Sequence, residues 1–441
     1  MMCDKLAFII KNTAMDKDLM HDIEILAIIW LSVFLASILS EKTRLTPVLW
    51  YLFFGSLLTN IGLLPIEMPT FITGFAELGI ITIMFSLGFE EETSNFLSSI
   101  KRSWGIAFFG AIAPFSIAYS FSLWLWDNFH IALLCGLAMT STTVSLTMAS
   151  LKTEGLNKSP AATGIMTSAV LDNIASLALL ATLMPIATAQ ASLKIDDILL
   201  IAAKATLFFL FVSFIGAILF PISKGWIKNI PIIGQFSLQQ VLTNKRGKHT
   251  MLALLLIAVL VALLAHYFGL HPAIGAYIAG LIIRKEYFDQ SASDHTTPKD
   301  IHFEQTLKMV DNIAFSWIGP VFFVVLGNKL LFDGDIILQV LPYALILFIG
   351  LFVGQILSAL LAAKYTGKFS WSESWMIGFG MLGRAELAFV VMDIAYVQTQ
   401  LISVNAFYTL MITCFLLNIS VPLTIRWWKA YFQTSVKTRA Y

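Results

Sequence analysis

The chain has 441 residues, of which 58% are hydrophobic and only 12% are charged, whereas soluble domains carry roughly 25% charged residues. Many apolar runs reach about 20 residues, the length a helix needs to cross a bilayer. The composition therefore excludes an ordinary soluble protein and predicts an all-α polytopic membrane protein in a lipid bilayer. The net charge of +1 argues against a nucleic-acid partner. The three scattered cysteines predict neither a disulfide framework nor a metal site, and we expect no cofactor.

Apolar runs in chain order predict thirteen membrane spans. A 1–21 extracytoplasmic segment without a cleavable signal peptide comes first, and a short cytoplasmic tail, 427–441, comes last. The second and ninth spans are short and contain proline and glycine, so we expect them to be tilted or partly re-entrant. The spans cover roughly residues 22–40, 46–60, 71–89, 104–125, 129–151, 159–183, 197–220, 250–268, 272–284, 307–328, 336–363, 372–398 and 404–426.

The basic residues between these spans predict an orientation. Twenty Lys and Arg residues fall on one side of the predicted topology and five on the other. Because cytoplasmic loops carry the excess of Lys and Arg, the N-terminus is expected outside and the C-terminus in the cytoplasm. The longest loop, 221–249, is expected on the cytoplasmic surface, where part of it can lie at the interface as an amphipathic segment.

With the long loop as the dividing point, the thirteen spans form a first set of six spans, one linking span and a second set of six spans. Two sets of six joined by one crossing have opposite orientations, which is typical of inverted-repeat transporters. In such folds, corresponding spans are interrupted near the bilayer midplane. The fifth span of each set contains helix-weakening residues there, and we expect a break in both. The first set contributes Thr140, Ser141 and Thr142, and the second contributes Gly380, Gly383, Arg384 and Glu386.

The sixth span carries Asp172 and Asn173 side by side in an apolar run. An ionisable side chain at bilayer depth is costly and is by default a candidate functional residue. The alternative is a permanently protonated acid that hydrogen-bonds a neighbouring helix. Adjacent residues on a helix point in different directions, so the sequence leaves open which of the two side chains faces an ion.

Other polar residues inside the spans have less distinct roles. Glu77 and Gln355 are expected to support a polar core, and the charged pair Arg384 and Glu386 is expected to hold the broken helix together. His266 and His271 flank a short turn near the outer surface. We interpret them as interfacial residues, with pH sensing as the alternative.

Four motifs, in order along nearly the whole chain, resemble those of the monovalent cation:proton antiporters. Within that family, which has the sodium/proton exchanger fold, they resemble the Kef-type and Nap-type branch. One of them, Gly383-Arg384-Ala385-Glu386, resembles a Kef-type motif. The others lie at residues 75–90, 269–280 and 320–327.

The resemblance implies two crossed broken helices, an elevator-like movement, a homodimer and a bacterial inner-membrane location. It implies core helices at about 71–183 and 307–426, and dimerisation helices at about 22–60 and 250–284. The family's critical aspartate is the second residue of its pair, which here is Asn173, and Gln355 stands where some members have lysine. No nucleotide-binding regulatory domain is expected, so such control would need a separate regulatory subunit.

A single carboxylate can serve an antiporter if a proton and a metal ion compete for it. Exchange of Na⁺ or K⁺ for H⁺ through Asp172 would then be electroneutral, with Asn173, Thr140, Ser141 and Thr142 as oxygen ligands. The alternative is a K⁺ efflux channel or uniporter on the same fold. An intramembrane protease is disfavoured because its motifs are missing, and the motifs above disfavour an organic-anion symporter.

Overall fold

The structure, a computed structural model, describes the chain in several stretches and in two compact units. The units are Met1–Ile83 with Asp311–Phe332, and Met84–Val310 with Asp333–Tyr441. Most of the expected seventh span and the whole 221–249 loop lie outside the described residues. Those residues are 2–43, 45–90, 93–157, 159–188, 250–268, 271–283 and 301–437, with isolated positions at 207–208, 211–212, 214 and 288.

The first unit is built on helices that approach each other at glycines. A Cβ atom at Gly55 would collide with the carbonyl group of Val324, and one at Gly327 would collide with that of Leu52. Small residues let helix backbones approach closely in membrane proteins, and here they bring α2 against α13. The unit contains α1 (Met2–Thr43), α2 (Pro47–Asn60), the first part of α3 (Thr70–Glu90), η3 (Ile313–Trp317) and α13 (Gly319–Asn328).

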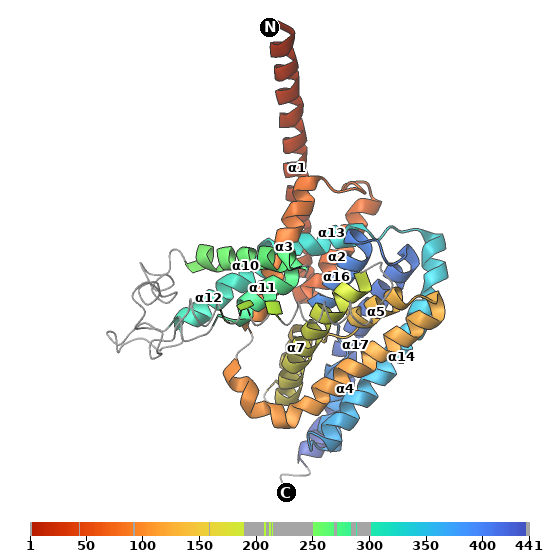
Figure 1. Cartoon of the computed structure of the whole chain (residues 1–441). Coiled ribbons are helices and arrows are strands. Elements are labelled where there is room, and N and C mark those ends of the chain that lie inside the picture. Colours follow the sequence, from red (N-terminus) through yellow and green to blue (C-terminus); the bar gives the residue numbers. More distant parts are fainter. Residues whose placement is uncertain are drawn as a thin grey trace, which may run out of the picture. The chain divides into compact units, whose positions relative to one another are not determined.

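The second unit contains the long helix pairs that surround the candidate site. In it, α4 and α14 lie side by side (Figure 1), and α14 also packs against α15 and α17. Its helices are α4 (Thr93–Trp126), α5 (Phe129–Ala138), α6 (Val144–Thr153), α7 (Pro160–Thr188), α10 (Thr250–Tyr267), α11 (Pro272–Leu281), α12 (Ile301–Asn312, up to residue 310), α14 (Gly334–Tyr365), α15 (Trp371–Gly380), α16 (Glu386–Asp393), η4 (Ile394–Gln398) and α17 (Val404–Lys437).

Local sequence signals account for several helix starts. The side chain of Asn128 accepts hydrogen bonds from two backbone N–H groups at the start of α5, and Asp333 does the same for α14. Ser370 and Glu373 form a capping box at the start of α15. Each cap satisfies N–H groups that the first helical turn leaves without an intrahelical partner. These signals fix the starts of α14 and of α5 and α15, the two helices that precede the expected interruptions.

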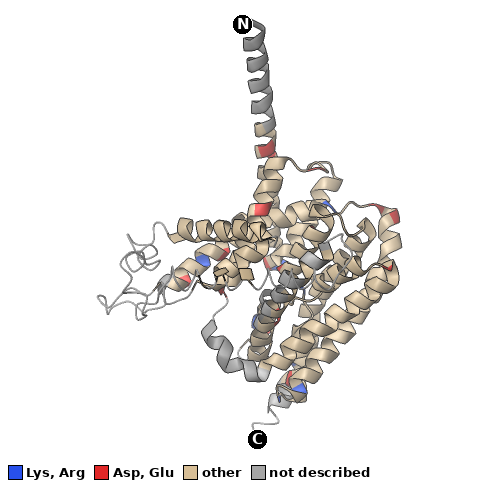
Figure 2. Ribbon diagram, in the orientation of Figure 1, with Lys and Arg blue, Asp and Glu red and all other residues tan. Residues whose placement is uncertain are grey.

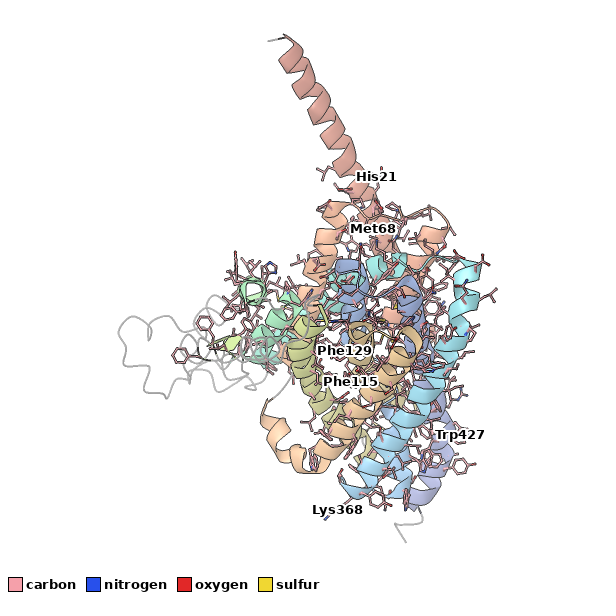
Figure 3. All side chains as sticks on the ribbon, turned by 45° about the vertical axis from the view of Figure 1, so that its right-hand side comes forward. His21, Met68, Phe115, Phe129, Lys368 and Trp427 are labelled. Atoms are coloured by element: carbon pink, nitrogen blue, oxygen red, sulfur yellow. The ribbon has the colours of Figure 1, made fainter. Side chains whose placement is uncertain are left out.

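Aromatic side chains hold the helices around the site. Tyr119 stacks on Phe115 and meets the ring of Phe129 edge-on, which fixes the start of α5 against α4. At the far end of α17, the ring of Trp428 packs against Trp375. Figure 3 labels Phe115, Phe129 and Trp427 within these groups. The helices themselves carry few charges, as Figure 2 shows.

The helical membrane fold predicted from the sequence is confirmed. Seven of the described helices are long and apolar enough to cross a membrane, and α5 and α11 are shorter apolar helices. The expected tenth span differs, because it is interrupted by η3 and restarts at α13, with Pro320 in the first turn. The terminal boundaries differ too, since α1 begins at Met2 and α17 continues to Lys437. The division into core and dimerisation helices stays a prediction.

Candidate functional site

The candidate site lies where two interrupted helices of the second unit meet. Residues 139–143 separate α5 from α6, and residues 381–385 separate α15 from α16. The two connecting stretches pair as an antiparallel bridge between Thr142 and Arg384. In this bridge the Thr143 N–H donates to Gly383 O at 3.1 Å, and the Ala385 N–H donates to Ser141 O at 3.4 Å. Both predicted interruptions are therefore present, and they cross.

The glycines of the second interruption permit this close approach. A Cβ atom at Gly383 would collide with the methyl group of Thr143, and one at Gly380 would press on Ile165 and Thr147. The Thr147 hydroxyl donates to Gly380 O at 2.7 Å, which satisfies a carbonyl group at the open end of α15. Gly380 and Gly383, predicted as helix-break residues, lie at the end of α15 and inside the unwound stretch.

Asp172 points at the first interruption from α7. Its side chain is fully buried, and Oδ2 accepts the backbone N–H of Thr142 at 3.0 Å. That N–H lies just before α6, where the helix dipole favours a negative charge. The other carboxylate oxygen, Oδ1, has no hydrogen-bond partner among the described residues. The carboxylate therefore keeps one oxygen available for a proton or a cation.

The neighbouring Asn173 is less buried than Asp172. Its Oδ1 atom is nevertheless enclosed, and within the described part of the chain it has no hydrogen-bond partner. The geometry thus brings Asp172 to the helix crossing and leaves Asn173 with an unpaired carbonyl oxygen on the adjacent part of the α7 surface.

Arg384 ties the two interruptions together. Its guanidinium is buried, with Nη1 donating to Met139 O at 2.7 Å and Nη2 donating to Gln355 Oε1 at 3.0 Å. Met139 caps the carbonyl end of α5, where the helix dipole favours a positive charge. The first interruption therefore has Asp172 at its N–H end and Arg384 at its carbonyl end. The two groups also act on each other electrostatically.

The structure gives the other predicted residues different environments. The Thr140 hydroxyl donates to Gly136 O at 2.9 Å and so continues the hydrogen bonding of α5. The Ser141 hydroxyl is buried and has no partner among the residues described. Gln355 is fully buried and contacts Arg384. Glu386 begins α16, and Glu77 lies on the part of α3 that belongs to the first unit.

The contacts of Arg384 bear on two sequence-based interpretations. Arg384 and Glu386 were expected to hold the broken helix together, and the Arg384 guanidinium donates to Met139 O and Gln355 Oε1. Gln355 stands where some members of the resembled family have lysine, and Arg384 brings a positive charge to the same cluster.

Asn418 is a residue of the site that sequence reasoning missed. Its side chain on α17 is buried, and its Oδ1 atom accepts the backbone N–H of Arg384 at 2.9 Å. Its amide within the apolar run of the last span was the available signal. The bond supports the unwound stretch directly beside the guanidinium.

The unpaired buried atoms define what this arrangement can do. Buried polar groups in proteins nearly always have a partner, so an unpaired one points to a bound water or ion. Asp172 Oδ1, Asn173 Oδ1 and Ser141 Oγ are oxygens, and oxygen ligands suit hard cations better than soft metals. The geometry therefore fits alternating occupation by a proton and a small cation.

Comparison with known proteins agrees with this arrangement. The model of the family described as transmembrane sodium/hydrogen exchanger matches residues 30–429. This chain belongs to that family. It is a multi-pass membrane transporter and not an enzyme, which confirms the resemblance drawn from the sequence motifs.

Relatives of this exchanger-family chain cover most of its length. It is 28% identical to the Na⁺/H⁺-K⁺ antiporter GerN of Bacillus cereus, over 70% of this chain and 72% of the relative. It is 24% identical to a Na⁺/H⁺ antiporter of Enterococcus hirae, over 92% of this chain and 98% of the relative. The structure of the sodium proton antiporter MjNhaP1 from Methanocaldococcus jannaschii has a TM-score of 0.62 at 15% identity, covering 93% of this chain and 99% of that one. The fold is therefore shared with a sodium/proton antiporter.

Proposed function

We propose that this chain exchanges a monovalent cation, Na⁺ or K⁺, for H⁺ across a bacterial cytoplasmic membrane, and that Asp172 binds the proton and the cation in turn. The observation that carries the proposal is a fully buried carboxylate at the helix crossing with one unpaired oxygen. Leaving a buried charge without a partner costs several kcal/mol. A proton or a cation removes that cost, so the two compete for one group.

The residues around Asp172 support this competition. The Thr142 N–H holds one carboxylate oxygen in place, while Ser141 and Asn173 offer oxygens that have no partner in the described structure. Arg384 is held by Met139 and Gln355, so its charge stays with the scaffold and does not block Oδ1. The relatives named above are a Na⁺/H⁺-K⁺ antiporter, a Na⁺/H⁺ antiporter and a sodium proton antiporter, which favours a monovalent cation and H⁺ as the cargo here.

The proposed cycle moves one cation against one proton and is therefore electroneutral. The loaded forms of Asp172 cross in an elevator-like movement, whereas the bare anion does not, because the charged and unpaired group would have to travel through a low-dielectric environment. We propose a homodimer as the working form, with the N-terminus outside and the C-terminus in the cytoplasm.

A pH-jump assay in proteoliposomes tests the proposal. With Na⁺ or K⁺ outside, wild-type protein is expected to move H⁺ in the opposite direction, and Asp172→Asn is expected to abolish this movement. Ser420→Ala serves as a control, because the Ser420 hydroxyl donates within its own helix, to Leu416 O. Full exchange by Asp172→Asn would refute the role of Asp172. Cation flux without any H⁺ movement in the wild type would instead support the alternative, a K⁺ efflux channel or uniporter.

A further inference from the structure

Aromatic and basic side chains gather at the end of the second unit where α14 ends and α15 begins. Trp371 on α15 is 51% exposed, and Trp427 and Tyr431 in the last part of α17 are 61% and 60% exposed. Lys368 precedes Trp371 by three residues, Arg426 directly precedes Trp427, and both basic side chains are exposed. Figure 3 labels Lys368 and Trp427. The proposed exchange assigns no role to any of these residues.

Contacts between the helices join these residues into one surface. Trp428 Nε1 donates to Ser372 O at 3.1 Å, which ties the end of α17 to the first turn of α15. The ring of Trp428 stacks on Tyr431, with ring centroids 5.3 Å apart. Lys364 Nζ, near the end of α14, lies 5.2 Å from the centre of the Trp371 ring, within the range of a cation–π contact. The aromatic–basic surface, as we call it, consists of Lys364, Lys368, Trp371, Arg426, Trp427 and Tyr431.

The turn between α14 and α15 holds Lys368 in a defined place. The Thr366 hydroxyl donates to Ala362 O at 2.6 Å, and the Phe369 N–H donates to Ala363 O at 3.0 Å. Between them, Lys368 has a φ of 53°, in the left-handed region that residues with a side chain rarely adopt. Because residues in such rare backbone conformations cluster at functional sites, the position of Lys368 indicates a role for this turn.

The positive charges of the aromatic–basic surface are available to an outside partner. The neighbouring carboxylates are already engaged, since Glu154 Oε2 accepts Lys429 Nζ at 2.9 Å and Glu373 Oε2 accepts a backbone N–H in the capping box of α15. Across the part of the chain that the structure describes, Lys368 and Arg426 have no ion-pair partner. The surface is therefore complementary to an anion.

The exposed rings beside these charges indicate the kind of anion. Trp and Tyr concentrate where membrane helices leave the bilayer, and basic pockets between the cytoplasmic ends of such helices bind anionic lipid head groups. Both α14 and α17 are long and apolar enough to cross a membrane, and this end of α17 is the one predicted to be cytoplasmic. A small soluble anion would use the charges and leave the rings without a partner.

We propose that the aromatic–basic surface binds an anionic phospholipid. Its basic side chains hold the phosphate, and its aromatic rings lie against the glycerol and the upper part of the acyl chains. A lipid bound there would hold the first turn of α15, the half-helix that leads to Gly380 and the second interruption. The lipid site is separate from Asp172 and does not depend on the proposed exchange.

The first test compares thermal unfolding of the detergent-solubilised protein with phosphatidylglycerol and with phosphatidylcholine. Wild-type protein should unfold several degrees higher with phosphatidylglycerol, because a ligand that binds the folded state stabilises it. In the double variant Lys368→Gln with Arg426→Gln, each lost charge should raise the half-saturating phosphatidylglycerol concentration about fivefold. The matched control, Lys42→Gln with Lys329→Gln, removes the same charge from the first unit and should respond like wild type. An equal loss in both double variants, or equal stabilisation of wild type by the two lipids, would overturn the proposal.

The second test separates a lipid from a soluble anion. Glycerol 3-phosphate carries the charged group without acyl chains and should not stabilise the wild type. Stabilisation equal to that by phosphatidylglycerol would refute a lipid as the occupant. Native mass spectrometry should find at least one more bound phosphatidylglycerol on the wild type than on the variant lacking Lys368 and Arg426, and equal numbers would refute the site. Neither readout involves transport, so failure of the lipid site leaves the proposed exchange standing, and the reverse holds too.

Discussion

At the scale of single residues, the site separates opposite charges along one broken helix. Asp172 takes the N–H end of α6 through Thr142, and Arg384 takes the carbonyl end of α5 through Met139. Each charge therefore compensates part of a helix dipole. Adjacent Asp172 and Asn173 could not be told apart from the sequence, because the rotation of α7 about its axis depends on the helices packed around it.

Arg384 is predicted to act by position as well as by charge. Arg384→Lys keeps the charge but cannot donate to Met139 O and Gln355 Oε1 together, since lysine lacks the planar fork of arginine. We expect a loss of exchange rate of about tenfold for Arg384→Lys and a larger loss for Arg384→Gln, because each hydrogen bond from a charged group contributes about 1.5–3 kcal/mol. Initial rates in proteoliposomes measure this. Equal rates for Arg384→Lys and the wild type would contradict the role of the fork.

At the scale of elements, the two interruptions were predictable and their surroundings were less so. A hydroxyl cluster at Thr140–Thr142 and glycines at Gly380 and Gly383 weaken helices locally, so the sequence indicates where they break. The π-helices η3 and η4 leave no comparable pattern, since their backbone irregularity depends on tertiary contacts. The bond from Arg384 to Asn418 joins residues 34 positions apart, and only packing brings them together.

The crossing itself is predicted to depend on Thr147. Thr147→Val removes the bond from the hydroxyl to Gly380 O and leaves a buried carbonyl group unpaired, at a cost of about 1–3 kcal/mol. Thermal unfolding of the detergent-solubilised protein should therefore begin at a lower temperature. Thr424→Val is the control, because Thr424 bonds only within its own helix, to Ser420 O and Val421 O. An equal lowering of the unfolding temperature by the two substitutions would show that the bond from Thr147 to Gly380 O does not stabilise the protein.

At the scale of the whole molecule, the composition, the apolar runs and the ordered motifs predicted the fold class and the family, and the comparisons confirm both. Hydropathy predicts the membrane-spanning helices well because every backbone polar group in a bilayer must be hydrogen-bonded, and a helix pairs these groups within one segment. The division into core and dimerisation helices and the dimer depend on contacts between two chains, whereas the orientation depends on how the chain inserts into the membrane. All three stay predictions.

An electroneutral cycle makes a prediction for the whole transporter. Moving one net charge across a potential of 100 mV changes the free energy by about 2.3 kcal/mol. One-for-one exchange moves no net charge, so the initial rate should be the same at 0 and at about −100 mV set by an ion gradient. A rate that changes several-fold with the potential would indicate a different stoichiometry.

The most direct measurement of the central claim is proton release on cation binding. Purified protein in weakly buffered solution near neutral pH would be mixed with NaCl, KCl or choline chloride, with a pH indicator present. If a proton and a cation compete for Asp172, Na⁺ or K⁺ releases protons, choline does not, and Asp172→Asn releases none. Cation binding without proton release, or the same release from wild type and Asp172→Asn, would contradict the account.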